Sequence, residues 1–175
     1  AACGDDAADA PFEPQSFGSE IIYTSETTVH FVTAGKEVDV ERDLGSSHYS
    51  TAGLVVSAYS DDSVLDEDLF LVREDGSITE IEVPAHVTIA TDPESPYLAW
   101  TDQDSHRGTV VVVNLLTGEE EARIKVPGKP IHTPYEVSID GDVAWLRDAE
   151  NHRAYRINWR TEKVTKADAH YLRQA

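Results

Sequence analysis

A repeat of about forty residues constrains the fold of this chain more than any other feature of its sequence. Three similar stretches recur along it: AYSD at residues 58–61, AWTD at residues 99–102 and AWLRD at residues 144–148. Their first residues are 41 and then 45 positions apart. A repeat of this length that holds several short strands is typical of a β-propeller, in which each unit forms one blade and packs against its neighbours.

Each repeat has the same layout, which predicts one four-stranded antiparallel blade. A first strand leads into the Ala-aromatic strand, a polar loop follows, and an alternating third strand is joined to a closing strand by a tight turn. We expect third strands at residues 69–73, 109–114 and 154–158, closing strands at 78–83, 122–126 and 163–166, and turns at 74–76, 116–118 and 160–162. Three further strands, at 21–24, 29–33 and 37–41, predict a first unit, so the three repeats with the Ala-aromatic stretches are the second, third and fourth. The predicted fold class is all-β, a β-propeller with about four four-stranded antiparallel blades and no long helix.

Two closures of the four blades agree with the sequence. The chain is part of a larger propeller, or it is a small closed ring in which residues 169–175 complete the first blade. The aromatic residues Tyr59, Trp100 and Trp145 follow the repeated alanines on the second strand, so we expect them in the core. The alternative is that these rings stack on a sugar ligand.

The third repeat, YLAWTDQDSHRGTVVVVNLLTGEEEARIKVPG at residues 97–128, resembles the YVTN-type repeat of bacterial seven-bladed propellers. The fourth repeat departs from that pattern, since it has Thr161-Glu162 where the family has Thr-Gly, and Trp100 replaces the usual small or polar residue after alanine. The resemblance implies the fold and leaves the function open, because the family includes surface proteins, binding proteins and relatives of quinoprotein dehydrogenases.

The first residues, Ala1-Ala2-Cys3-Gly4, resemble the end of a bacterial lipobox, the cleavage motif of lipoprotein signal peptides. The resemblance implies that Cys3 carries a diacylglycerol group, whose two acyl chains suffice for stable membrane anchoring. The absence of methionine agrees with the loss of a signal peptide upstream. We expect a lipidated N-terminus and flexible acidic linker over residues 1–19, propeller repeats over 20–175, and an extracytoplasmic lipoprotein anchored to the cell membrane.

The charge balance excludes some partners. The chain has 33 acidic and 14 basic side chains, with a formal net charge of −19, and 23 of the acids but only three of the bases lie at or before residue 104. Such a surface repels nucleic acid and anionic lipid headgroups, so membrane contact is expected through the lipid anchor alone. The single cysteine excludes a disulfide within the chain and thiol-based zinc sites.

Histidines and aspartates recur with the repeat. His48, His86, His132 and His170 each follow a closing strand, and Asp61, Asp102 and Asp148 each begin the polar loop after a second strand. In a propeller these two sets of loops lie on one face, so all seven side chains are candidate ligand-binding residues at the mouth of the central channel. In WD-type propellers, however, a histidine at this position hydrogen-bonds an aspartate and locks the blade. His48 with Asp61, His86 with Asp102 and His132 with Asp148 are the corresponding pairs.

The same residues suggest two metal hypotheses. A ring of imidazoles at the channel mouth suits zinc or copper, with His86 and His132 as the candidate ligands. The carboxylate-rich stretches at 61–68 and 102–104 suit calcium, although neither has the glycine and terminal glutamate of a complete calcium loop. No other cofactor is predicted.

No catalytic motif stands out. The sequence has no Gly-x-Ser-x-Gly, His-Glu-x-x-His, Gly-x-x-x-x-Gly-Lys or Gly-x-Gly-x-x-Gly stretch. We therefore expect a binding module of the cell envelope whose partner is an envelope protein or a small molecule. The alternatives are a metal- or quinone-dependent oxidoreductase or a lactonase-like hydrolase on a propeller scaffold, and a purely structural envelope protein.

Overall fold

The computed structural model describes residues 21–60, 63–84, 87–102, 108–127, 135–148 and 153–167. This part of the chain consists of β-strands, turns and connections, as the repeat predicted. It contains no helix with the length and apolar character needed to span a bilayer.

The described residues form four antiparallel sheets of consecutive strands. The first sheet consists of β1 (Ile22–Ser25), β2 (Thr28–Phe31) and β3 (Lys36–Asp39). The second consists of β4 (Leu44–Ser50), β5 (Gly53–Ser60), β6 (Ser63–Val72) and β7 (Ile78–Ile81). The third consists of β8 (Ile89–Thr91), β9 (Tyr97–Asp102), β10 (Thr109–Asn114) and β11 (Glu120–Lys125). The fourth consists of β12 (Tyr135–Asp140), β13 (Val143–Asp148), β14 (Arg153–Asn158) and β15 (Lys163–Ala167).

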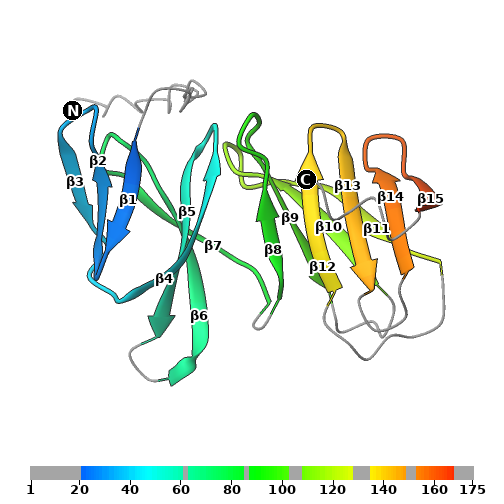
Figure 1. Ribbon diagram of the computed structural model, residues 1–175, viewed down its shortest axis with the longest axis horizontal. Helices are drawn as coiled ribbons and strands as arrows, with labels where there is room; N and C mark the ends of the chain where they lie inside the picture. The colour runs from blue at the N-terminus through cyan, green and yellow to red at the C-terminus, as the bar shows by residue number, and fades with distance from the viewer. Residues whose placement is uncertain are drawn as a thin grey trace, which may run out of the picture.

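The four sheets stand side by side in chain order, as blades do (Figure 1). Their first strands face one another, since β8 contacts both β4 and β12, and β1 contacts β4. The first and fourth sheets lie at opposite ends of the row in Figure 1, so the described blades form an open arc. Residues 169–175, which the closed-ring hypothesis places in the first blade, lie outside the described residues.

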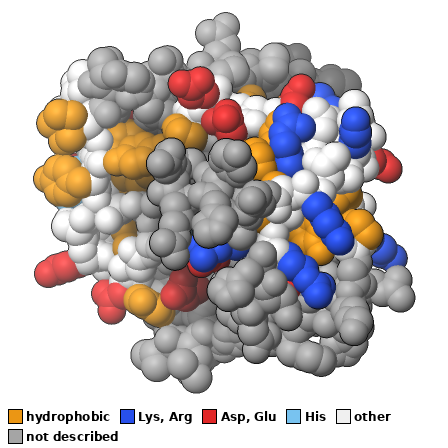
Figure 2. All heavy atoms as spheres, turned by 45° about the vertical axis from the view of Figure 1, so that its right-hand side comes forward, with side chains coloured by type: hydrophobic (Ala, Val, Ile, Leu, Met, Phe, Trp, Pro, Cys, Tyr) orange, Lys and Arg blue, Asp and Glu red, His pale blue; other side chains and the backbone are white. Residues whose placement is uncertain are grey.

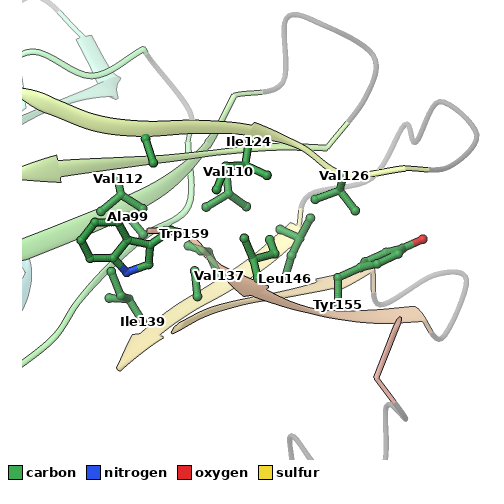
Figure 3. Close-up of a cluster of buried hydrophobic side chains, with 13 residues drawn as sticks. Ala99, Val110, Val112, Ile124, Val126, Val137, Ile139, Leu146, Tyr155 and Trp159 are labelled. Atoms are coloured by element: carbon green, nitrogen blue, oxygen red, sulfur yellow. The ribbon is translucent and has the colours of Figure 1, made fainter. Parts of the chain in front are cut away.

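Apolar side chains fill each space between neighbouring blades. One cluster, which includes Phe31 and Val56, joins the first and second sheets, and a second, which includes Val55 and Trp100, joins the second and third. Figure 3 shows the third cluster, in which Val110, Val112 and Val126 from the third sheet and its end face Leu146, Tyr155 and Trp159 of the fourth sheet and its last turn. Because the third sheet is covered on both faces, β10 is buried at its first five positions and reads as a continuous run of valines rather than an alternating strand.

Along one edge of the arc, hydrogen bonds join the turns between the first two strands of successive blades. The Thr51 N–H of the β4–β5 turn donates to the Ser95 carbonyl of the β8–β9 turn at 3.2 Å. The Gly141 N–H of the β12–β13 turn donates to the Asp92 carboxylate at 2.7 Å. We call these three turns, residues 51–52, 92–96 and 141–142, the turn belt. It links the second, third and fourth blades.

The turns before the closing strands confirm the prediction and explain one departure from the repeat. Gly118 has φ +72° and Glu162, at the equivalent place in the fourth unit, has φ +55°. Both residues are in the left-handed region, which glycine adopts freely and glutamate adopts at a cost. The turn geometry is therefore kept in the fourth repeat although its glycine is absent.

The repeated alanines do not occupy equivalent faces, and this corrects the expectation for the aromatic residues. Ala99 packs against the following blade, so the adjacent Trp100 points back to the second blade and is 5% exposed. Ala144 packs against the preceding blade, which turns Trp145 to the other face of its sheet, where it is half-buried. Tyr59 is 38% exposed, so the prediction of a core position is wrong for this residue.

Candidate functional site

A pocket of ≈ 400 Å³ lies between the second blade and the start of the third, toward the edge of the arc opposite the turn belt. Its polar wall comes from Ser46 and His48 of β4, Ser57 of β5, Glu67 of β6 and Thr88 just before β8. Its apolar wall comes from Leu69 of β6, from Val83, Pro84 and Val87 of the β7–β8 connection, and from Ile89 of β8. The β7–β8 connection and the strands β5 and β6 thus meet on one side of the blades, as expected for a propeller.

The pocket exists because the first strand of the third blade is short. β8 has three residues, whereas β4 has seven and β12 has six. The half of β4 that carries His48 is therefore faced, across the space between the two blades, by residues 83–84 and 87–88, which belong to no strand.

A bulge in the second blade places the two serines. The pairing of β4 with β5 shifts register between Leu44 and Ser47. In this bulge, the Ser46 N–H donates to Ser57 Oγ at 2.8 Å, and the two hydroxyl oxygens are 3.1 Å apart. A Cβ on Gly45 would lie 2.6 Å from Ser57 Oγ, so the absence of a side chain at residue 45 allows this approach. A glycine within a strand is the sequence signal that could have predicted the bulge.

His48 is half-buried, and desolvation lowers its pKa below the ordinary value for histidine. The imidazole is therefore neutral at pH 7, with one nitrogen free to accept a hydrogen bond and one that donates. Glu67, by contrast, is exposed and supplies the negative charge of the described pocket wall.

The structure places few of the predicted site residues. His48 lines the pocket, and Asp148 is fully buried at the end of β13. Asp102 ends β9, and its side chain is not described. Four other predicted residues, His86, His132, His170 and Asp61, lie outside the described residues, as does Cys3. The three histidine–aspartate locks and the channel-mouth site stay predictions.

The metal hypotheses gain no site from the described part of the chain. Within it, no group of three or more His, Cys, Asp or Glu side chains could hold a metal ion. The calcium hypothesis treated residues 61–68 as a loop, but residues 63–68 belong to β6. In a strand, successive side chains point to opposite faces. Glu67 accordingly lines the pocket, while Asp68 pairs with Arg42 instead. The candidate zinc or copper ligands His86 and His132 lie outside the described residues.

No protein-family model matches the chain, and no curated protein sequence matches it. Solved structures do. A chain of a nidogen/laminin complex superposes with a TM-score of 0.50 at 13% identity and covers 89% of this chain and 61% of its own. Regucalcin from Agrobacterium tumefaciens str. C58, described as a calcium-binding protein, gives 0.51 at 12% identity, over 89% of this chain and 58% of regucalcin. TolB from Acinetobacter baumannii gives 0.52 at 11% identity, over 87% of this chain and 42% of TolB.

This chain therefore spans about two fifths to three fifths of the length of these proteins. Regucalcin and TolB are β-propellers, and at such low identity the likeness concerns the fold alone. The four successive antiparallel sheets, the apolar clusters between them and these likenesses together show that the chain has an all-β, β-propeller fold.

Proposed function

We propose that this chain is a binding module of the cell envelope, anchored through lipidated Cys3, which takes a small ligand in the pocket around His48. The observation that carries the proposal is a concave site in which an imidazole, three hydroxyl-bearing side chains and a carboxylate face an apolar wall. The lining of this pocket is more polar than apolar. Convergent polar groups of this kind fix the orientation of a small ligand in its site.

The geometry favours binding over hydrolysis. A serine nucleophile needs a base within hydrogen-bond reach. In the described residues, the hydroxyl oxygens of Ser46 and Ser57 lie near each other, and neither is hydrogen-bonded to His48. The serines therefore act as ligand-binding hydroxyls, and no described residue activates them.

The anchoring part of the proposal draws on the sequence. Ala1-Ala2-Cys3-Gly4 matches the lipobox pattern, and a lipid on Cys3 would hold the propeller at the outer face of the membrane. The acidic residues that follow agree with a linker that anionic headgroups repel.

A fragment screen by ligand-observed NMR tests the binding function. A library that holds amines, alcohols, sugars and carboxylic acids is screened against the wild-type chain, His48→Leu and His30→Leu. His30 lies on the outer face of the first sheet and serves as the matched control. We expect ligands that bind the wild type and His30→Leu and are lost with His48→Leu. Absence of any such ligand refutes the proposal, and conversion of a bound compound into a product would favour the enzyme alternative instead.

A further inference from the structure

The charges around the pocket select the kind of ligand, provided that the pocket is the binding site proposed above. Glu67 is the charged side chain of the described pocket wall, and no described lining residue is a lysine or an arginine. Arg42, in the connection between β3 and β4, is paired with Asp68 on the other face of β6. An anionic ligand would therefore meet a carboxylate and no cation to pair with it.

The exposed basic side chains gather elsewhere. Figure 2 shows Lys and Arg side chains concentrated on the side of the molecule that carries the fourth sheet. The exposed basic residues of that sheet are Arg153, Arg156, Lys163 and Lys166, on β14 and β15. With a net charge of −19, the chain as a whole attracts cations, and the acid-rich first part of the sequence supplies most of the pocket.

An aromatic ring stands beside the carboxylate. Tyr59 and Glu67 are directly opposite each other in the β5–β6 ladder, so their side chains share one face of the sheet. Tyr59 is not itself a lining residue of the pocket, but it is 38% exposed and is the cross-strand neighbour of the lining residue Glu67. An exposed tyrosine ring next to a carboxylate is suited to a cation, which the face of the ring attracts.

The remaining groups favour an organic cation over a bare metal ion. His48 and Glu67 are the two side chains of the described wall that commonly ligate metals, and two are too few to hold one. Leu69, Val83 and Ile89 form an apolar wall that a hydrated ion would leave uncovered but a hydrocarbon chain would cover.

We infer that the His48 pocket binds a small organic ammonium ion, with its charged head at Glu67 and Tyr59 and its hydrocarbon part against Leu69, Val83 and Ile89. The Ser46 and Ser57 hydroxyls and the neutral His48 ring are acceptors for the N–H groups of the ligand. Because burial lowers the pKa of His48, the imidazole adds no positive charge at pH 7 that would repel the ligand.

Isothermal titration calorimetry with three compounds of similar size tests this inference: n-butylammonium, n-butanol and butyrate. We expect butylammonium to bind the wild-type chain, n-butanol to bind at least about tenfold more weakly, and butyrate not to bind. Glu67→Gln should weaken butylammonium binding about tenfold, and Tyr59→Leu several-fold. Glu80→Gln, which removes an exposed carboxylate of the same sheet outside the pocket, should leave the affinity unchanged.

The outcomes separate this inference from the proposed function. If n-butanol or butyrate binds and is lost with His48→Leu while butylammonium does not bind, the ligand class is wrong and the binding function stands. If Glu67→Gln and Glu80→Gln weaken butylammonium binding equally, the cation is held by the general acidity of the surface and the inference is overturned. If no compound binds here or in the fragment screen, the proposed function itself fails.

Discussion

Replacing Asp92 with alanine should destabilise the chain more than any other single change at its turns. Asp92 is 3% exposed and its carboxylate accepts three hydrogen bonds. One oxygen accepts from the Glu94 N–H at 2.8 Å, and the other accepts from Ser95 Oγ at 2.7 Å and from the Gly141 N–H at 2.7 Å. The last bond joins the third blade to the fourth, across 49 positions of sequence.

The expected cost follows from the burial and charge of this acceptor. A hydrogen bond to a charged group contributes about 1.5–3 kcal/mol, and alanine leaves three donors without it. Water can reach part of the turn and satisfies some of them, so we expect Asp92→Ala to lower the free energy of unfolding by about 3–5 kcal/mol. Asp92→Asn keeps the shape and one good acceptor and should cost about half as much.

Urea unfolding followed by tryptophan fluorescence measures the effect, because Trp159 donates its indole N–H to the Gly141 carbonyl at 2.8 Å and so reports on the same turn. The matched control is Asp75→Ala. Asp75 accepts from the Ser77 N–H at 2.8 Å in the same local geometry, but it is exposed and bonded within its own turn. This control should cost about 0.5–1 kcal/mol. If Asp92→Ala costs no more than Asp75→Ala, the bond between blades contributes nothing and the reasoning is refuted.

Three further changes test other parts of the structure. Glu162→Gly should raise the free energy of unfolding by about 0.5–1 kcal/mol, and Gly118→Ala should lower it by about 1 kcal/mol, because both residues have positive φ. A Cβ at residue 118 would meet no atom within 4 Å, so the cost there comes from the backbone conformation alone. Equal effects of the two changes in urea unfolding would contradict this reasoning. Because burial lowers the pKa of His48, the unfolded chain takes up a proton below about pH 6.5 that the folded chain does not. The stability of the folded chain should therefore fall as the pH falls from about 6.5 toward the folded-state pKa of His48. Thermal melts at several pH values should show that His48→Gln lacks this part of the pH dependence. With a lipoprotein signal peptide in a bacterial host, the wild type should partition into the detergent phase and Cys3→Ser into the aqueous phase, and equal partitioning would refute lipid anchoring.

The number and type of strands could be predicted from the sequence because each blade repeats the same local physics. The third strand of the third repeat was expected at 109–114 and lies at Thr109–Asn114. The loop before the valine run and the Thr-Gly turn after it fix both ends of this strand. The turns at 116–118 and 160–162 were likewise predictable, because residues of positive φ are placed by local geometry.

The pocket could not be predicted in the same way. It depends on where β8 begins, on a one-residue bulge near Gly45 and on the early start of β6 at Ser63. Each of these is set by the bounds of a strand or by the register in which it pairs with its neighbour. A shift of one residue moves every side chain of a strand to the other face of its sheet, and the hydrophobic pattern tolerates such shifts where both faces are covered by neighbouring blades. The sequence motif aligned three alanines, whereas the structure turns Ala99 to the following blade and Ala144 to the preceding one.

The two edges of the arc therefore contribute differently. At the edge with the turn belt, the Asp92 carboxylate and backbone hydrogen bonds hold the second, third and fourth blades together. Toward the other edge, β8 begins only at Ile89, and the second and third blades leave the pocket between them. A ligand seated there would contact both blades and would bind the folded chain alone, so occupancy should raise the stability of the chain. Because the hydrogen bonds of the turn belt hold the blades together without the ligand, the pocket can stay open until a ligand fills it.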